Sequence, residues 1–463
     1  MQRFKPNFGG GQFSKNPSPY TLTTKRLPTR RSVIWLGQTC NLSCYFCYFA
    51  SRIADRTHPE HPFFTLEKAK AMCKIFVEEY GCNSIDIQGG EPTIYPHIFE
   101  LIEYCGSIGL KPTLITNLIA LSKFEYAKKF KEAGIYDFLV SLHGVGENYD
   151  KIVGKKGAFE KQMQALHNLK DLRVPIRINA VLSNEVIEDL EALTDIAIEF
   201  GARAVNFLGY NNSGDQKRLR DMHKIPYYDI IAQRLMPCID RLEANGIEVN
   251  LRFLPFCVVD EKYRKNIYNG LQSVYDIHEW EHSLRLWTDR AAQRQAKAQI
   301  EPRSTRYYLT RIKLGRAFRL KSLMWLQRAI MPFVKFAPKY APIEHYQDKI
   351  LQKIRFYTPF CEFDPNLSKL EHFYKEQHRV FRDLTHEKIH TKKCQECSIK
   401  AICDGFHCDF IEEFGSASVK PIKLDMEVKD PKFYSKHQLK VIESQEWEWY
   451  FTPKEIEEIE NRQ

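Results

Sequence analysis

The chain has 463 residues, of which 43% are hydrophobic and 13% aromatic. This composition supplies enough apolar surface for a large core and excludes a generally disordered chain. The formal charge is +10, and 17 basic against 6 acidic residues fall between Glu261 and Tyr340. Because no run of about 18 apolar residues occurs and no signal-type segment precedes Val33, we expect a cytoplasmic protein that is neither secreted nor membrane-spanning.

Residues 1–31 are rich in Gly, Pro, Ser and Thr and show no periodicity, so we expect an extended lead-in. From residue 32, short apolar runs alternate with amphipathic stretches of ten or more residues, which indicates strands that alternate with helices. The predicted strands are Val33–Leu36, Ser84–Gln88, Pro112–Thr116, Phe138–Leu142, Ile176–Leu182, Ala204–Gly209 and Ile247–Phe253. The predicted helices are Leu66–Glu79, His97–Ile108, Lys123–Ala133, Phe159–Lys170, Val186–Phe200 and Tyr228–Asn245.

Six consecutive β-α steps imply parallel strands that form either an open sheet or a barrel. Unusual polar residues directly follow several of the strands, among them Gly89–Pro92, Asn117 and His143. Active sites of β/α barrels gather at this carboxyl face, whereas an open sheet concentrates them at one switch point. The sequence therefore predicts an α/β fold, a partial (β/α)6 TIM-type barrel over residues 32–260.

The remaining chain divides into three further segments. Residues 261–350 predict a basic helical insertion, 351–433 a small cysteine-rich domain and 434–463 a tail helix. Residues Pro302–Ile343 carry ten Lys or Arg and no Asp or Glu among many apolar side chains. Such a segment can form a packed lid or contact a membrane surface or lipid-like substrate. Nucleic acid is the least expected partner, because no RNA-binding module is recognisable.

Cys40, Cys44 and Cys47 have the spacing C-x3-C-x2-C in the loop after the first strand. Three neighbouring thiolates can hold a [4Fe-4S] cluster and leave one iron without a protein ligand. An open coordination position of this kind allows a substrate or cofactor to bind the metal, whereas a structural zinc ion takes four protein ligands. Zinc and ordinary buried thiols are the alternatives.

The run CNLSCYFC, with Phe46 before the third cysteine, resembles the radical S-adenosylmethionine (SAM) superfamily, and the resemblance extends over most of residues 32–210. It implies an enzyme that binds SAM at the cluster and cleaves it reductively to a 5′-deoxyadenosyl radical, which abstracts hydrogen from a substrate. It also implies a reducing partner such as flavodoxin or ferredoxin. We expect a small-molecule substrate. An RNA- or peptide-modifying enzyme and a non-catalytic zinc or iron-sulfur protein remain alternatives, and no catalytic residue toward the substrate is assigned.

The same resemblance assigns the SAM contacts. Gly89-Gly90-Glu91-Pro92 matches the family's GGEP motif, whose backbone and glutamate hold the SAM amino group. The family places further polar contacts at the strand ends, which here are Thr116, Asn117 and Ser141. Arg177 and Asn179 alternate with apolar residues along one strand, so both should face the same side, which we expect to be the barrel interior. For each of these residues, a structural role in a turn or at the barrel mouth is the alternative.

A second cysteine group, Cys394-x2-Cys397-x5-Cys403-x4-Cys408, follows far downstream. Four cysteines in fifteen residues indicate a metal site, either zinc or iron-sulfur. The run resembles the SPASM and twitch extensions of radical SAM enzymes, which implies one auxiliary [4Fe-4S] cluster on Cys394, Cys397 and Cys403. The last gap departs from the family's C-x3-C and puts Cys408 in doubt. We favour Cys257 as the fourth ligand, with Cys361 as the alternative.

Overall fold

The computed structural model describes residues 20–23, 29–47, 50–54, 56, 61–78, 82–210, 224–269, 272, 277–281, 388–430, 432–443, 453–454 and 457. The basic segment 302–343 and Cys361 lie outside the described residues, as do Asn211 and Asn212. None of the described helices is long and apolar enough to cross a membrane.

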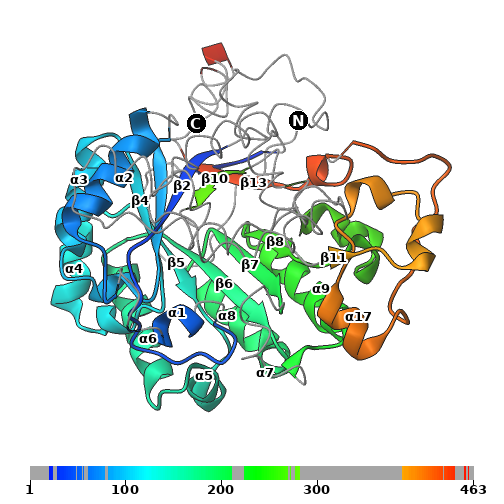
Figure 1. Cartoon of the computed structure of the whole chain (residues 1–463), viewed down its shortest axis with the longest axis horizontal. Helices are drawn as coiled ribbons and strands as arrows, with labels where there is room; N and C mark the ends of the chain where they lie inside the picture. The colour runs from blue at the N-terminus through cyan, green and yellow to red at the C-terminus, as the bar shows by residue number, and fades with distance from the viewer. Residues whose placement is uncertain are drawn as a thin grey trace, which may run out of the picture.

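The centre of the molecule is a curled sheet of nine parallel strands with helices on its outer side (Figure 1). In spatial order the strands are β10 (Ile277–Glu281), β2 (Thr29–Trp35), β3 (Ser84–Gln88), β4 (Lys111–Thr116), β5 (Asp137–Ser141), β6 (Ile176–Leu182), β7 (Ala204–Gly209), β8 (Glu248–Arg252) and β9 (Ile267–Tyr268). From β2 to β9 this order follows the chain, as a barrel wall requires. The prediction of a partial barrel is confirmed, and the wall has more strands than the six β-α steps expected.

Helices connect most of these strands. They are α1 (Ala50–Ala54), α2 (Leu66–Glu78), α3 (Ile98–Ser107), α4 (Phe124–Glu132), α5 (Gly146–Val153), α6 (Ala158–Asp171), α7 (Asn184–Glu188), α8 (Leu190–Glu199) and α9 (Tyr228–Ala244). Short 3-10 helices follow several strands: η1 (Pro92–Ile94), η2 (Ile119–Ser122), η5 (Phe256–Val258) and η6 (Glu261–Asn266). Because all strands of the sheet are parallel, the polar loops expected at their carboxyl ends lie along the same edge of the sheet.

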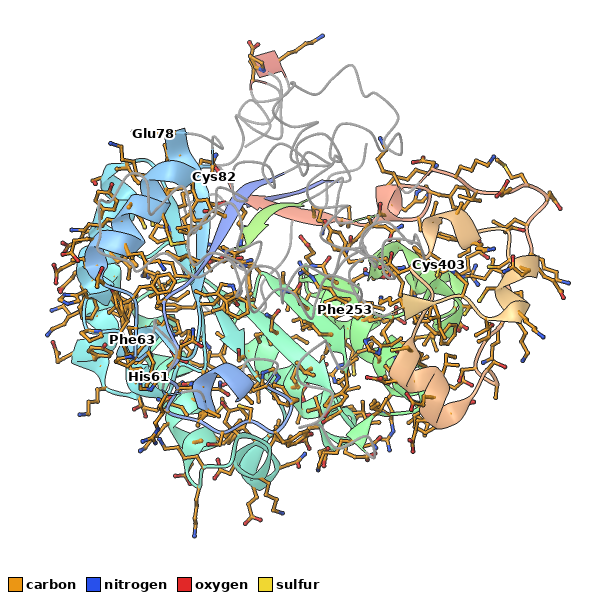
Figure 2. All side chains as sticks on the ribbon, in the orientation of Figure 1. His61, Phe63, Glu78, Cys82, Phe253 and Cys403 are labelled. Carbon is orange, nitrogen blue, oxygen red and sulfur yellow. The ribbon has the colours of Figure 1, made fainter. Side chains whose placement is uncertain are left out.

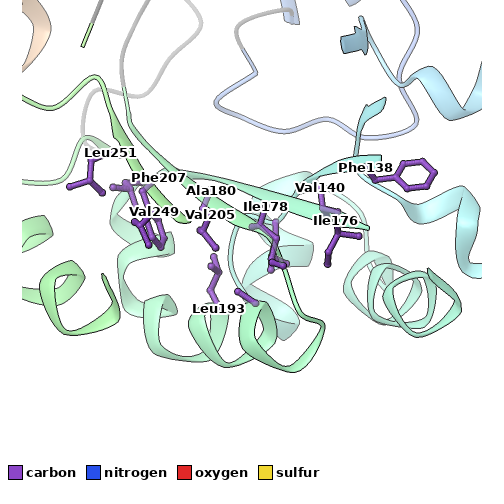
Figure 3. Packing of buried hydrophobic residues seen from close by; sticks show 14 of the residues in the cluster. Phe138, Val140, Ile176, Ile178, Ala180, Leu193, Val205, Phe207, Val249 and Leu251 are labelled. Carbon is purple, nitrogen blue, oxygen red and sulfur yellow. The ribbon is translucent and has the colours of Figure 1, made fainter. Parts of the chain in front are cut away.

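The sheet presents different chemistry to its two faces. Val140, Ile178, Val205 and Val249 pair in register on neighbouring strands, and all four are buried. Figure 3 shows this apolar row pointing toward the outer helices, where Leu193 of α8 packs beneath it. Because successive side chains alternate between faces, the residue after each member of the row points into the barrel interior.

The cysteine-rich region packs against the last barrel helix. Its elements are β11 (Lys388–Ile389), η8 (Lys392–Glu396), η9 (Lys400–Ile402), β12 (Phe406–His407) and α17 (Cys408–Phe414). Phe410 of α17 stacks on Tyr228 of α9 with ring centroids 3.8 Å apart. Figure 2 labels Phe253, which follows β8 in the barrel, and Cys403, which belongs to the cysteine-rich region. The barrel and the cysteine-rich region thus share a buried aromatic contact.

Several elements differ from the predictions. β10 lies in the segment expected to be a helical insertion, and it pairs with β2, although its sequence Ile-His-Glu-Trp-Glu shows no strict alternation of apolar residues. β1 (Tyr20–Thr23) pairs antiparallel with β13 (Lys440–Glu443), so strands occur in the expected lead-in and tail helix; η10 (Ser435–His437) precedes β13. The expected helix 186–200 is interrupted at Asp189, whose carboxylate accepts hydrogen bonds from the Val145 N–H and the Asn148 amide.

Candidate functional site

The first cysteine loop follows β2 and is held by α5. The backbone N–H of Ser43 donates to the carbonyl of Val153 at 3.0 Å, and that of Tyr45 to Ile152 at 3.4 Å. Gly154 ends α5 with a φ of +68°. A Cβ there would lie 3.3 Å from the Ser43 carbonyl oxygen, so glycine permits the close approach of helix and loop.

The three thiols of this loop lie within eight residues of one another in the sequence and are each partly buried. Burial, together with the neighbouring Glu91 and Cys47, raises the pKa of Cys40 to about 12. Burial also raises the pKa of Cys44, with Cys47 and then Cys40 as the next contributions. Because iron binds thiolates, loading the site must release the protons that this environment retains.

Tyr45, between the second and third cysteines, braces the loop against the end of β6. Its hydroxyl is 2.6 Å from the Ser183 hydroxyl and 2.8 Å from the Glu185 carboxylate. Lys224 forms an ion pair with Glu185 and lies 4.5 Å above the Tyr45 ring. These contacts tie the middle of the loop to the start of α7.

Phe46 packs edge-on against His143, with ring centroids 4.5 Å apart. Burial lowers the pKa of His143 to about 3, so the imidazole is neutral, and its Nδ1 accepts the Val181 N–H. The aromatic residue expected at the site therefore lies on the rim formed by β5 and β6.

The GGEP turn passes directly beneath the cysteine loop. Gly89 and Gly90 have φ values of +100° and +58°, and a Cβ on Gly90 would lie 1.9 Å from the Thr39 carbonyl oxygen. The N–H of Glu91 donates to the same carbonyl at 2.9 Å. Only glycine fits this contact between the two loops.

The Glu91 carboxylate is buried and accepts hydrogen bonds from neighbouring residues. It accepts hydrogen bonds from the backbone and hydroxyl of Thr93, the hydroxyl of Thr116 and the N–H of Asn117. Three of these donors reach Oε1 and one, the Asn117 N–H, reaches Oε2, so Oε2 keeps a lone pair for a further donor. Burial raises the pKa of Glu91, which these hydrogen bonds oppose. The hydrogen bonds tie the GGEP turn to the end of β4.

Asn117 also reaches the cysteine loop, because its Nδ2 donates to Asn41 Oδ1 at 2.8 Å. Thr116 and Asn117, expected to contact SAM, thus lie beside the cysteines and Glu91. Asn41 and Tyr45 were missed by sequence reasoning. Their only sequence signal is their place between the cysteines, which does not reveal the distant partners Asn117 and Ser183.

Arg177 and Asn179 share the inner face of β6, as expected, but at different levels. Arg177 lies near the amino end of β6 and donates to Asp137 at 2.7 and 3.0 Å; it also lies 3.7 Å from Asp86, which pairs with Arg31 at 2.8 Å. This network forms a charged floor at the end of the barrel opposite the cysteine loop. The structure therefore assigns Arg177 to the floor, whereas Asn179 pairs in register with Ser141 nearer the rim.

The second cysteine group opens onto a small pocket. Cys257, Cys394, Cys397 and Cys403 all line it, and Cys408 does not. Burial raises the pKa of Cys403 to about 12 and that of Cys257 to about 11. The Gly405 N–H points at the Cys403 sulfur from 3.4 Å. Backbone N–H groups directed at sulfur stabilise the thiolates that bind iron.

A third group of possible ligands was not expected from the sequence. In the part of the chain that the structure describes, His407, Cys408 and Asp409 each place a possible ligand atom within 4.8 Å of the others. This group contains Cys408, which does not line the pocket of the other four cysteines.

Comparison with known proteins agrees with this geometry. Residues 36–197 match the Radical SAM superfamily, so this part of the chain is a radical SAM domain. The superfamily uses a [4Fe-4S] cluster and SAM, and Cys40, Cys44 and Cys47 lie within the matched residues.

Two relatives come from Methanosarcina barkeri. An Fe-coproporphyrin III synthase is 29% identical over 41% of this chain and 43% of its own length, and an AdoMet-dependent heme synthase is 31% identical over 40% and 53%. The chain thus spans about half the length of these relatives. Among solved structures, Streptococcus suis SuiB bound to S-adenosylmethionine has a TM-score of 0.39 at 21% identity, covering 48% of this chain and 50% of that one.

Proposed function

We propose that the chain is a radical SAM enzyme acting on a small-molecule substrate. The observation that supports this proposal is the loop of Cys40, Cys44 and Cys47, which follows β2 at the carboxyl end of the sheet and falls within the residues that match the Radical SAM superfamily. The cluster that these thiolates would hold supplies, when bound, an electron for reductive cleavage of SAM to a 5′-deoxyadenosyl radical, which abstracts hydrogen from the substrate.

The residues around the loop have separate roles in this proposal. The backbone of Gly89 and Gly90 approaches the cysteine loop closely and offers groups for the SAM amino group, and Glu91 with Pro92 fixes that turn. Phe46 and Asn117 offer apolar and polar contacts beside it. Ser141 and Asn179 face the barrel interior below the rim.

We propose that Cys257, Cys394, Cys397 and Cys403 hold an auxiliary [4Fe-4S] cluster, since all four line one pocket. Four protein ligands leave no open iron, so this centre would transfer electrons and would not bind substrate. A flavodoxin or ferredoxin is the proposed electron donor. The relatives reported above are named for coproporphyrin and heme, which supports a small molecule as the substrate. A peptide is the second candidate, because a 27% identical relative is named PqqA peptide cyclase.

Anaerobic reconstitution followed by incubation with SAM and dithionite tests the proposal. We expect about eight irons per chain and formation of 5′-deoxyadenosine with methionine. Cys44→Ala should abolish the product and retain about four irons, whereas Cys238→Ala, in α9 and away from both groups, should behave as the wild type. Fully loaded protein that produces no 5′-deoxyadenosine with any candidate substrate would contradict the assignment.

A further inference from the structure

A strand and a helix of the cysteine-rich region meet at three consecutive residues whose side chains are all metal ligands. His407 ends β12, and Cys408 and Asp409 begin α17. Their imidazole, thiol and carboxylate each place a possible ligand atom within 4.8 Å of the others. His407 is 3% exposed and Asp409 is fully buried, whereas Cys408 is partly buried. The group therefore lies inside the fold, and its thiol residue is the one that reaches toward the surface.

The separations between the ligand atoms match those around a single ion. The Asp409 carboxylate is 3.6 Å from Cys408 Sγ through Oδ1 and 3.7 Å from His407 Nδ1 through Oδ2. Ligand atoms held at about 2.0 to 2.3 Å from a tetrahedral zinc ion lie roughly 3.3 to 3.8 Å apart. Small side-chain movements are therefore enough for the three residues to converge on one ion.

The donor set of one nitrogen, one sulfur and one oxygen favours zinc. Calcium and magnesium take oxygen ligands, and iron-sulfur clusters are held mainly by thiolates, whereas zinc accepts all three donor types. A divalent cation would also neutralise the Cys408 thiolate and the Asp409 carboxylate, because charges in the interior are costly unless they are paired or bind a metal. Three protein ligands leave the fourth position of a tetrahedral ion to water or a further group.

The three residues are separate from the auxiliary cysteine pocket. None of them lines the pocket shared by the other four cysteines. Between Cys403 and Cys408 the chain passes through β12, which carries Cys408 past the pocket to the start of α17. A metal ion held by this group would therefore be additional to the iron of the two cysteine sites.

We propose that His407, Cys408 and Asp409 form a zinc site that fixes α17 to β12. The next residue of α17, Phe410, stacks on Tyr228 of α9 with ring centroids 3.8 Å apart. An ion at the base of α17 thus holds the helix that packs the cysteine-rich region against the barrel. This site goes beyond the proposed function, because it requires neither SAM cleavage nor a particular substrate.

Metal analysis of the anaerobically reconstituted full chain tests the zinc site. After incubation with zinc sulfate and gel filtration, the wild type should hold about one zinc beside about eight irons per chain. Asp409→Asn and Cys408→Ser should each lower zinc affinity at least about tenfold, measured by competition with a fluorescent chelator, and leave iron unchanged. Asp425→Asn makes the same substitution at an exposed position of the same region and should keep both metals.

Zinc K-edge X-ray absorption separates this site from the cysteine pocket, because it should record one sulfur and two or three nitrogen or oxygen ligands. Four sulfur ligands would place zinc in the auxiliary pocket and overturn the proposal. A wild type that binds no zinc would also overturn it, as would loss of iron together with zinc in Asp409→Asn. Cys408→Ser changes a partly exposed side chain, so it decides the question even if Asp409→Asn does not fold. Normal zinc binding without 5′-deoxyadenosine formation would contradict the proposed function alone.

Discussion

The two cysteine regions differ in how the chain brings their thiols together. Cys40, Cys44 and Cys47 belong to one loop, whose shape is set by contacts with α5, Gly90 and Tyr45. The second pocket takes three thiols from the cysteine-rich region and one, Cys257, from the barrel after β8. The first region offers three thiols at the carboxyl end of the sheet, and four thiols line the second pocket. Coordination number thus separates a centre that can bind a cofactor from one suited to electron transfer.

The strongest test of this comparison removes one ligand from the three-thiol loop. Cys40→Ser should eliminate the first cluster and all SAM cleavage, because two thiolates cannot hold it, while about four irons remain on the second site. Iron and sulfide analysis with EPR of the reduced protein measures this. Loss of both clusters together would mean that the two centres are not independent.

Comparing Cys403→Ser with Cys408→Ser sharpens the assignment of the second region. Cys403 lines the pocket and Cys408 does not, so only the first substitution should lower iron from about eight to about four per chain. Both residues lie in the same short segment, which makes Cys408→Ser a matched control. Equal iron loss in the two variants would show that the pocket has been misassigned.

Gly90→Ala tests the contact between the GGEP turn and the cysteine loop. Its Cβ would lie 1.9 Å from the Thr39 carbonyl oxygen at a positive φ, so we expect a loss of about 2 kcal/mol or more in unfolding free energy and poor loading of the first cluster. Gly109 also has a positive φ, +83°, but nothing lies within 4 Å of its Cβ position. Gly109→Ala should cost only about 1 kcal/mol and load normally, as chemical denaturation and iron analysis would show.

The charged floor should make stability depend on pH in the acid range. Burial alone would raise the pKa of Asp137, but the Arg177 guanidinium, supported by Arg31 and Arg203, lowers it to about 2. The folded pKa is below the unfolded value near 3.9, so this carboxylate stabilises the fold above about pH 4, and that stabilisation is lost as pH falls toward 2.

The size of this contribution is about 2 kcal/mol. In the apo protein, the difference in unfolding free energy between wild type and Asp137→Asn should therefore shrink between pH 5 and pH 2. A difference that stays constant over this range would show that Asp137 has an ordinary pKa.

The smallest expected effect concerns the hydrogen bonds of the Tyr45 hydroxyl. Tyr45→Phe removes the hydrogen bonds to Ser183 and Glu185 but keeps the ring, so we expect about 1 kcal/mol less stability and roughly two- to fivefold faster loss of iron to a chelator. Tyr104→Phe, on α3, serves as the control, since the Tyr104 hydroxyl has no hydrogen-bond partner among the described residues. Identical rates of iron loss in both variants would show that the Tyr45 hydroxyl does not stabilise the cysteine loop.

The sequence predicts the barrel wall well and its edges poorly. The bounds of β3, β6 and β7 agree with the predicted strands, because short segments rich in β-branched and apolar residues, bounded by turn residues, are strong local signals. β10 and β13 are short strands whose partners, β2 and β1, lie more than two hundred residues away. Such pairings depend on tertiary packing, which no local pattern encodes.

In the candidate site too, local features can be predicted from the sequence and long-range contacts cannot. The cysteine spacing and the GGEP motif are local, so sequence alone places the residues that the structure brings together. The hydrogen bonds that Glu91 accepts from Thr116 and Asn117, and the engagement of Arg177 by Asp137, depend on partners tens of positions away. Long-range hydrogen bonding decides which of several polar residues on one face remain available to a ligand.

The origin of Cys257 in the barrel has a consequence for assembly. A metal centre joining residues 257 and 394 would act as a covalent cross-link that closes a loop of more than a hundred residues. In the chain-entropy view, a cross-link of this span restricts the unfolded chain by about 5 kcal/mol. Metallation of the pocket and docking of the cysteine-rich region on α9 would therefore be one coupled event, and a cysteine-rich fragment produced without the barrel would lack a ligand that its own sequence does not contain.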